Sequence, residues 1–499
     1  MSSPVTAPHK LRRVARLPIL AVIGGALVLG GLADRSGSGR VAASPPLIQP
    51  MPVAPPASAL SSTWFCAGAS GHPRQVADGE LVVANAGGRR LSGTAVLLPS
   101  QGRAVAVPFG VGAHSRTTVD EAPAGDAPFV GALVRLDGGA AGVEQVVTGA
   151  EGVSTSACAT TGSDHWYFAD GTTQENSSLF VSLVNPYPED AIADLSFWTE
   201  QGSEAPADFQ GVVVPARGVI GLDIGAHLRR RAQVATTVSV RAGRVAAFKT
   251  QVVNGPPPGG APGSGATAQS RVPGLSLVLG APSAATQLWW PAGQTDSGVT
   301  ERYEIYNPSQ TPAEVTLRVD LDEGSADPFD IRIPPGSTQT VVSNAESRIP
   351  RGIGHAAELV STNGTGVVAE RTLDASSPSL ATGLADVGGS RLQARWWLLA
   401  AGSSGPSLKE SIVVFNPGTA AVDVSVAGLN GQVAAIGGLA GLSLPPGRRL
   451  VLPLQSGSPA ADRALVVEAS GNVIVERDMN RVQAAGIDAT IGIPLLDAP

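Results

Sequence analysis

Residues 166–186 read WYFADGTTQENSSLFVSLVNP, and this stretch contains the pattern that decides the fold. A tryptophan with an aromatic neighbour is followed by a short apolar run that stops at an asparagine. The pattern occurs four times, with aromatic pairs at Trp64-Phe65, Trp166-Tyr167, Trp289-Trp290 and Trp396-Trp397 and with asparagines at Asn85, Asn185, Asn307 and Asn416. Such self-similarity indicates a tandem array, so we expect four related modules.

The third copy predicts the strands of one module. The segment 314–324, EVTLRVDLDEG, alternates apolar and polar residues in its first part, as a half-buried strand does. Pro334-Pro335-Gly336 divides the next apolar stretch into two strands. Asn363-Gly364 predicts a hairpin between strands at 355–362 and 366–373. Helical periodicity is absent, and the pattern indicates about seven or eight strands per module.

The spacing of the repeats favours immunoglobulin-like β-sandwiches. Successive repeat tryptophans, counted from the first of each pair, lie 102, 123 and 107 residues apart, close to the ~100 residues of one sandwich. We therefore expect an all-β chain whose modules follow one another as a rod. The predicted modules are residues 63–162, 163–285 with a flexible Pro- and Gly-rich loop at 254–270, 286–393 and 394–499. A β-propeller, with two blades per interval forming a closed ring, is the alternative.

The N-terminus predicts a membrane address. Residues 9–16 are basic, and residues 17–32 form an uncharged apolar run. Arg16 can snorkel, and with the apolar flanking residues the run reaches the ~20 residues that a spanning helix needs. The expected segments are a cytoplasmic basic tail at 1–13, one transmembrane signal anchor at 14–33 and a Pro/Ser-rich linker at 34–62.

The anchor predicts the compartment and restricts the partners. By the positive-inside rule, residues 34–499 are expected to be extracytoplasmic in a single-pass protein of the cell membrane. A cleaved signal peptide ending near Gly31-Leu32-Ala33, and hence a secreted protein, is the alternative. The net charge of −7 makes nucleic acid an unexpected partner, because an acidic chain repels phosphate backbones.

Two cysteines agree with export. Cys66 follows the first repeat tryptophan, and Cys158 lies on the strand expected to close the first module. An isolated pair in an exported protein typically forms a disulfide, which here would join the two ends of that module. Two free buried thiols are the alternative; a metal site is disfavoured because neither cysteine has a second Cys or His at ligand spacing.

The repeat also resembles a known family. The stretch 166–186 and the later VVAER at 367–371 are similar to a repeat of exported actinobacterial proteins, and with WFCAG at 64–68 the chain resembles the actinobacterial domain-of-unknown-function family 5719 over residues 60–499. The resemblance implies an anchored envelope protein with immunoglobulin-like modules, whose partner would be a membrane glycosyltransferase or another envelope protein. It brings no catalytic residues. The first module departs from the pattern, since Gln145 rather than Arg follows Glu144.

The repeated tryptophans and charged pairs have competing interpretations. Exposed tryptophans would stack on sugars, but a large aromatic residue at one repeated position is more typical of packing. Glu370-Arg371 and Glu476-Arg477 suggest acid/base chemistry, yet the second module has Phe248-Lys249 instead. We therefore expect these arginines to lie over a sandwich surface and pair with acids.

The acidic segment 320–330, DLDEGSADPFD, is the one candidate metal site. Asp320, Asp322 and Asp327 offer the oxygen ligands that calcium prefers. EF-hand spacing is absent because Gly324 occupies the fifth position, so a solvated hairpin loop is the competing interpretation.

Catalytic motifs are absent from the sequence: there is no H-E-x-x-H, no G-x-S-x-G and no phosphate-binding glycine loop. We expect no catalytic residues and no cofactor. The sequence thus predicts a non-enzymatic, membrane-anchored extracytoplasmic scaffold or accessory protein of the cell envelope, and the resemblance adds an association with glycan-synthesis machinery. An adhesion or glycan-binding protein is one alternative, and an envelope hydrolase is a second.

Overall fold

The computed structural model describes residues 51–69, 77–254, 272–377, 381–403, 408–454, 463–481 and 486–498. In this part of the chain all regular structure consists of β-strands and three short 3-10 helices, which confirms the all-β prediction. The predicted tail at 1–13, the predicted anchor at 14–33 and all but the first residue of the predicted loop at 254–270 lie outside the described residues. Among the described residues, no helix has the length and apolar character needed to cross a membrane.

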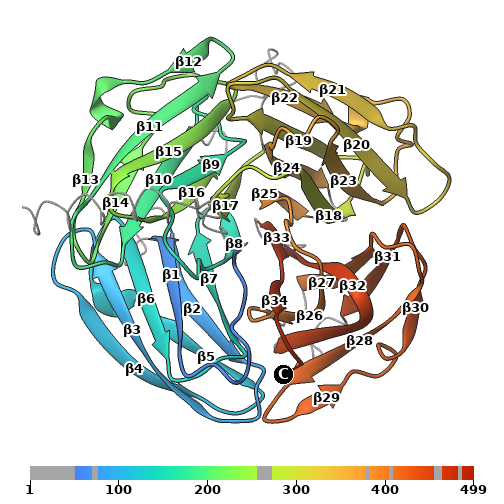
Figure 1. The fold of residues 1–499 in the computed structure, drawn as a ribbon, viewed down its shortest axis with the longest axis horizontal. Coiled ribbons are helices and arrows are strands. Elements are labelled where there is room, and N and C mark those ends of the chain that lie inside the picture. Colours follow the sequence, from blue (N-terminus) through green and yellow to red (C-terminus); the bar gives the residue numbers. More distant parts are fainter. Residues whose placement is uncertain are drawn as a thin grey trace, which may run out of the picture. The chain divides into compact units, whose positions relative to one another are not determined.

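Modules 1 and 2 are formed by the first seventeen strands (Figure 1). Module 1 contains β1 (Ser62–Ala69), β2 (Asp78–Asn85), β3 (Leu91–Pro99), β4 (Val105–Val111), β5 (Ser115–Asp120), η1 (Ala122–Ala124), β6 (Val130–Leu136), β7 (Ala141–Gly149) and β8 (Gly152–Ala157). Module 2 contains β9 (His165–Phe168), β10 (Ser177–Asn185), β11 (Ala191–Thr199), β12 (Gly202–Glu204), η2 (Ala207–Phe209), β13 (Val212–Val214), β14 (Gly218–Asp223), β15 (Val234–Ala242), β16 (Ala246–Val253) and β17 (Gly274–Leu279).

Modules 3 and 4 repeat this arrangement. Module 3 contains β18 (Gln287–Gly293), β19 (Val299–Asn307), β20 (Ala313–Leu321), β21 (Phe329–Ile333), β22 (Ser337–Val342), η3 (Ser343–Ala345), β23 (His355–Ser361), β24 (Val368–Ser377) and β25 (Ala381–Gly388). Module 4 contains β26 (Ala394–Leu399), β27 (Leu408–Asn416), β28 (Val422–Leu429), β29 (Val433–Ala435), β30 (Leu442–Leu444), β31 (Arg448–Leu454), β32 (Ala464–Arg481), β33 (Ile487–Ile491) and β34 (Ile493–Leu495).

Modules 1 to 3 each contain two separate antiparallel sheets, as a β-sandwich does. In module 1 the strand orders are β1-β6-β3-β4 and β5-β2-β7-β8, and module 3 has the same orders as β18-β23-β20-β21 and β22-β19-β24-β25. In module 4 the long strand β32 pairs with β26 and β28 through its first half and with β27 and β33 through its second half. The sheets are open, those of modules 1 to 3 are separate, and in module 4 they share β32; this arrangement fits the predicted sandwiches.

The repeated tryptophans fill the cores of the sandwiches. One tryptophan in each module is completely buried: Trp64, Trp166, Trp290 and Trp397. The indole N–H of Trp166 donates to the carbonyl of Val245 at 2.8 Å, and that of Trp290 donates to Val387 at 3.1 Å. The packing interpretation is therefore confirmed for these four residues, and sugar stacking on them is excluded because no face is exposed.

The side chain of the repeated asparagine stabilises the turn in which the residue lies. Asn307 is completely buried, and its amide Nδ2 donates to the carbonyls of Thr311 at 2.8 Å and Ile333 at 3.1 Å, while its Oδ1 accepts from the N–H of Ser309 at 3.0 Å. Asn85, Asn185 and Asn416 make the equivalent bonds in their own modules. The asparagine thus connects its own turn to the edge of the opposite sheet. This second contact could not be predicted from the turn sequence alone.

Asn307→Asp is expected to lower the free energy of unfolding by about 2 kcal/mol, because a carboxylate oxygen would face two carbonyl oxygens that lose their donor. Chemical denaturation of the variant measures this loss. Asn363→Asp is the matched control, since Asn363 also donates to a carbonyl, that of Pro312, but is exposed to water. Equal losses for both variants would contradict a buried structural role for Asn307.

The predicted hairpin at Asn363-Gly364 is wrong, although the turn is present. Gly364 has a positive φ of 78°, as a turn glycine does. The flanking strands β23 and β24 belong to different sheets, because β23 pairs with β18 and β20 whereas β24 pairs with β19 and β25. The Asn-Gly turn therefore carries the chain from one sheet of the sandwich to the other.

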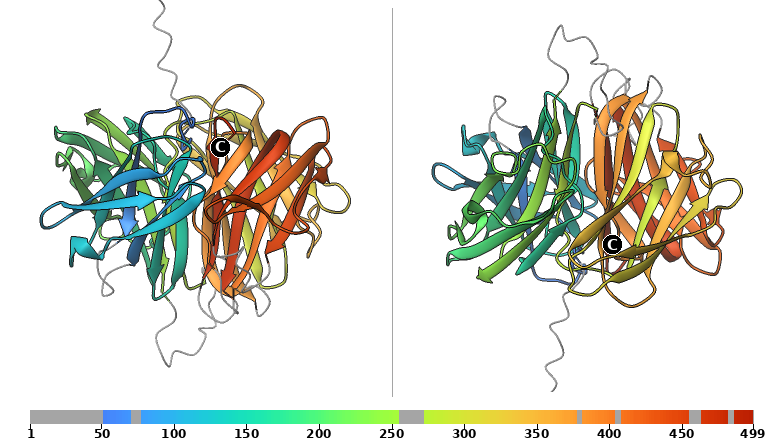
Figure 2. Two further views of the ribbon diagram at one scale, coloured as in Figure 1. Left: turned by 90° about the horizontal axis from the view of Figure 1, so that it is seen from below. Right: turned by 90° about the horizontal axis from the view of Figure 1, so that it is seen from above.

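One strand at or near the end of each module, here named the closing strand (β8, β17, β25 and β33), contacts the closing strands of two other modules. β8 and β25 each pack against both β17 and β33, and Figure 1 shows the four strands next to one another between the modules. Leu277 N–H donates to Ser154 Oγ at 3.0 Å, and Thr155 N–H donates to Asp488 Oδ1 at 2.9 Å. Modules 1 and 4 are therefore neighbours, as Figure 2 also shows, and the expected linear rod is wrong.

The two ends of the described chain meet at this contact between modules 1 and 4. Ala54 forms a parallel bridge with Leu495, and its N–H donates to the carbonyl of Pro494 at 3.0 Å. Residues 51–61, which the composition places in the linker at 34–62, thus lie partly against the modules. Cys66 and Cys158 form the predicted disulfide, with their Cα atoms 4.8 Å apart, and both cysteines are completely buried.

Candidate functional site at the junction of the modules

The glutamates of the repeated Glu-Arg pairs are buried between modules. Glu370 and Glu476 lie on β24 and β32 beside the closing strands, and Glu144 has the same place on β7. Glu370 Oε1 accepts from the N–H of Ala169 at 2.9 Å, Glu476 Oε2 from Ala292 at 3.3 Å and Glu144 Oε2 from Ala401 at 2.6 Å. Each donor belongs to the segment that follows the repeat tryptophan of a neighbouring module. The repeated glutamate therefore connects two neighbouring modules and does not lie on the surface.

Two cations at the position that follows the repeated glutamate contact the glutamate of the next module, whereas a third, Arg477, pairs with Glu410 of its own module. Lys249 of module 2 contacts Glu370 of module 3, with 2.5 Å between Nζ and Oε2. Arg371 of module 3 contacts Glu476 of module 4, with 2.5 Å between Nη2 and Oε1. The predicted pairing of arginines with acids is confirmed, but the predicted surface location is wrong, since Arg371 and Arg477 are at most 1% exposed. Burial between modules explains why such a pair is needed, because an unpaired buried charge is costly.

The junction between modules 1 and 2 lacks this charge pair. Gln145 stands where the arginine would be and donates to Glu121 in its own module at 2.8 Å, while Phe248 replaces the glutamate. Phe248 is completely buried in one apolar cluster with residues of both modules, including Phe65 and Leu277. This junction is therefore held by apolar packing, together with a hydrogen bond from Thr250 Oγ1 to the carbonyl of Gly68 at 3.2 Å.

The conformation of Gly68 at this apolar junction favours glycine. Its φ is +138°, which L side chains rarely adopt, and a Cβ placed on it would lie 2.2 Å from Leu277 Cδ1 of module 2. A larger residue would therefore strain the backbone and require the end of the Leu277 side chain to shift.

Three carboxylates gather around Lys249 at the junction of modules 2 and 3. Ligand oxygens of Asp170, Glu370 and Asp386 lie within 4.8 Å of one another, and all three residues are buried. Lys249 Nζ donates to Glu370, to Asp386 at 2.5 Å and to the carbonyl of Asp170 at 2.8 Å. Burial raises the pKa of Glu370 to about 8, although Lys249 opposes this. The lysine ammonium thus supplies the positive charge that a bound metal ion would otherwise supply.

The buried carboxyl groups make stability depend on pH. Burial raises the pKa of Glu144 from 4.5 to about 7, with the hydrogen bond from Ala401 opposing the shift. Because the folded-state pKa is raised, the contribution of Glu144 to stability is fully present below pH ~4.5 and is lost as the pH rises through about 7. The loss is on the order of 3 kcal/mol.

Unfolding titrations between pH 4.5 and 8 test this prediction. The variant Glu144→Gln keeps an acceptor for Ala401 but cannot ionise, so its stability should decrease less across this range than that of the wild-type chain. Glu80→Gln, which alters an exposed glutamate on β2, should leave the pH dependence unchanged. Parallel titration curves for wild type and Glu144→Gln would contradict a buried, titrating Glu144.

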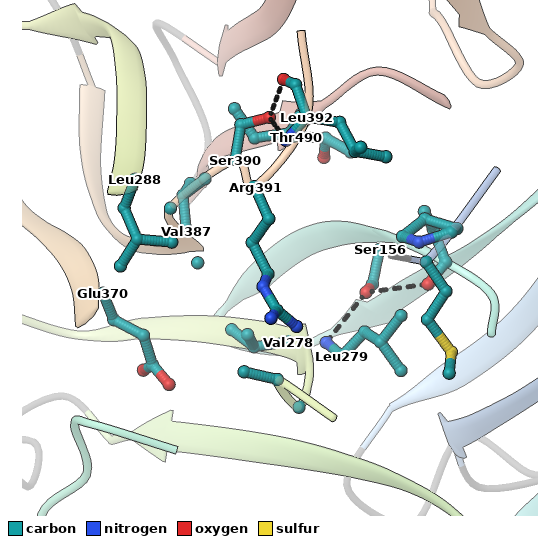
Figure 3. Close-up of a pocket in the computed structure, with 18 of the residues that line it drawn as sticks. Ser156, Val278, Leu279, Leu288, Glu370, Val387, Ser390, Arg391, Leu392 and Thr490 are labelled. Atoms are coloured by element: carbon teal, nitrogen blue, oxygen red, sulfur yellow. Dashed lines mark hydrogen bonds between the residues drawn. The ribbon is translucent and has the colours of Figure 1, made fainter. Parts of the chain in front are cut away.

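An axial cavity of about 140 Å³ lies where the closing strands meet. Its walls are mainly apolar and include residues of all four closing strands, such as Ala157, Leu277, Val387 and Ile491. Figure 3 shows the Arg391 side chain pointing into the cavity toward Val278 and Leu279. Arg391 Nη2 donates to Ser283 Oγ at 2.5 Å and to the carbonyl of Ala284 at 3.3 Å.

The predicted calcium ligands do not come together. Both oxygens of Asp322 accept hydrogen bonds from Arg449 of module 4 at 2.8 Å, and Asp327 is exposed. Burial raises the pKa of Asp320, which disfavours its charged form. Among the described residues, the carboxylates close enough to share a metal ion are those around Lys249. The sequence did not indicate this buried group because it combines Glu370 and Asp386, from two strands of module 3, with Asp170 from the segment after β9 of module 2.

The second half of module 1 and almost all of module 2 match a known family. The sequence model of DUF5719, a family of unknown function, matches residues 113–283 and confirms the resemblance over this part. No curated protein matches the chain.

Several solved structures match the chain at low similarity. The crystal structure of Thermotoga maritima 1070 is 15% identical, with 22% of this chain and 95% of that chain covered and a TM-score of 0.20. The Anabaena sensory rhodopsin transducer is 18% identical, with 18% and 88% covered and a TM-score of 0.16. The α-L-rhamnosidase of Streptomyces avermitilis complexed with L-rhamnose is 10% identical, with 80% and 54% covered and a TM-score of 0.11. Similarities at this level carry no functional argument.

Proposed function

We propose that this chain, whose residues 113–283 match the DUF5719 family model, is a non-enzymatic extracytoplasmic scaffold of the cell envelope, anchored in the membrane by residues 14–33. One observation carries the proposal: the repeated charged residues connect modules to one another. Glu370 and Glu476 are each bonded both to a backbone N–H and to a cation of a neighbouring module. Residues engaged in this way hold an assembly together and are not free to act on a substrate.

The disulfide supports the extracytoplasmic location. Cys66 and Cys158 are the only cysteines of the chain, and disulfides persist mainly in oxidising compartments. The anchor predicted at 14–33 supplies attachment to the cell membrane, and the family resemblance suggests glycan-synthesis machinery, in particular a membrane glycosyltransferase, as the partner.

The two alternatives receive less support. Glycan binding through the repeated tryptophans would need exposed rings, and Trp64, Trp166, Trp290 and Trp397 have none. A hydrolase would need two carboxyl groups facing a cleft, whereas Glu370 and Asp386, which line the axial cavity, are both bonded to Lys249.

Cross-linking of the full chain in native membranes, followed by affinity purification and mass spectrometry, tests the proposal. We expect a stable complex containing a membrane protein with glycosyltransferase activity, and loss of that complex when residues 1–33 are replaced by a cleavable secretion signal. A full chain that is anchored in the membrane but purifies as a monomer without partners would overturn the scaffold function. Hydrolysis of envelope glycans by the purified chain would overturn its non-enzymatic part.

A further inference from the structure

The axial cavity has the size and the lining of a small-ligand site. Its volume of about 140 Å³ is close to the ~150 Å³ of an engineered apolar cavity that binds benzene. Leu288, Val278, Leu279 and Val387 form apolar walls (Figure 3). A ligand of about six to eight non-hydrogen atoms with an apolar body would therefore fit.

Arg391 gives this cavity an incompletely paired positive charge. A guanidinium group has five N–H donors, of which Arg391 uses the two on Nη2 for Ser283 and Ala284. Its Nε and Nη1 atoms are buried and have no acceptor within the described part of the chain, and no described carboxylate forms an ion pair with it. Burial lowers the pKa of Arg391, which reflects the cost of holding this charge away from water.

Arg391, which is partly buried, differs from the fully buried cations at the junction. Lys249, Arg371 and Arg477 each contact a carboxylate, so their charges are balanced within the fold. Among the described residues, the guanidinium of Arg391 has hydrogen bonds only to a hydroxyl group and a carbonyl oxygen. Since charges with little access to water are normally paired in folded proteins, an anion in the cavity would complete its contacts.

The rest of the lining restricts that anion to one negative charge. Glu370 and Asp386 also line the cavity but are paired with Lys249, and Arg391 is the only basic residue in the described lining, so one positive charge is left for a ligand to balance. Thr155, another lining residue, is 3% exposed, and its Oγ1 has no partner in the described structure, so one more polar contact is available. The apolar walls favour a ligand with a short hydrocarbon body over a small hydrated ion.

We propose that the axial cavity binds a monocarboxylate with a short apolar body, whose carboxylate pairs with Arg391 and whose hydrocarbon part lies against Val278, Leu288 and Val387. Binding requires a shift of the Arg391 side chain that brings its buried N–H groups to the ligand. The ligand would contact the closing strands of several modules at once, so its binding stabilises their junction.

Calorimetry on the full chain in detergent micelles tests this site with hexanoate as the probe, against 1-hexanol and hexylamine. We expect hexanoate to bind with one site per chain and to raise the unfolding temperature. Hexanol should bind at least about 10-fold more weakly because it lacks the charge-assisted hydrogen bond. Hexylamine should not bind. Equal binding of hexanoate and hexanol, or no saturable binding of hexanoate, would overturn the proposal.

Three variants separate Arg391 from general effects on the fold. Arg391→Met should weaken hexanoate binding at least about 10-fold and leave hexanol binding unchanged. Val278→Phe, which fills the cavity and keeps Arg391, should abolish binding of both probes. Arg395→Met is the matched control, because Arg395 is exposed and does not line this cavity. Wild-type hexanoate affinity in folded Arg391→Met or Val278→Phe would contradict the site.

Discussion

Glu476→Ala is expected to lower the free energy of unfolding by about 3–5 kcal/mol, the cost of removing one partner of a buried ion pair. Glu476 is completely buried, and its two carboxylate oxygens lie 2.5 and 3.4 Å from Arg371 Nη2 and Nη1. The substitution removes this carboxylate from Arg371 and also the acceptor of the Ala292 N–H. Chemical denaturation of the full chain measures the loss.

The double variant Glu476→Leu with Arg371→Met tests the cause of this loss. It removes both charges and keeps most of the volume, so it should destabilise the chain less than Glu476→Ala alone. The control is Glu314→Ala, because Glu314 pairs with Arg332 at 2.8 Å on the exposed surface of the same module 3. That control should cost less than about 1 kcal/mol. A loss for Glu476→Ala as small as that of the control would show that the pair does not hold modules 3 and 4 together.

Cys66→Ala combined with Cys158→Ala is expected to lower the free energy of unfolding by about 4.5 kcal/mol, the chain-entropy value for so long a loop. The bond joins residues 92 positions apart and so restricts the unfolded chain strongly. It also ties β1, which opens module 1, to the residue after β8, which closes it. Losing the bond should therefore affect the contacts of β8 with β17 and β33.

A reductant distinguishes the bond from the packing of the two sulfur atoms. The wild-type chain should unfold at lower denaturant concentration when reduced, whereas the double variant should be insensitive to the reductant. If the oxidised wild-type chain and the double variant had the same free energy of unfolding, the prediction would be wrong. Hydrogen exchange should localise the effect. The double substitution should accelerate exchange of the β8 amides more than that of the amides in β20, a strand of module 3.

The local sequence determines the strands and the turns, and these were predictable. Pro334-Pro335-Gly336 separates β21 from β22, and the alternation of 314–324 produces β20. The repeated tryptophan could be assigned to the core because a large aromatic residue recurs at one position. The pairing partners of β23 and β24 were not predictable, since an Asn-Gly turn has the same sequence whether it joins paired strands or crosses between sheets.

The site was less predictable because it depends on what covers the sheets. A period of two places successive residues on opposite faces of a strand, but it does not show whether the second face meets water or another module. Glu370-Arg371 therefore read as surface residues, although both are buried. One feature of the sequence could have indicated that the cation has a structural role. Module 2 keeps a cation, Lys249, at the position of Arg371, although Phe248 replaces the glutamate there.

The cyclic contacts of the closing strands have a consequence for cooperativity. A linear array of repeats has terminal units with one neighbour, and such arrays can fray from their ends. In this chain β8, β17, β25 and β33 each have two closing-strand neighbours, so no module occupies a terminal position. Opening any one module breaks two junctions at once. Loss of order should then spread through all four modules in a single calorimetric transition, and an excised single module should not be stable.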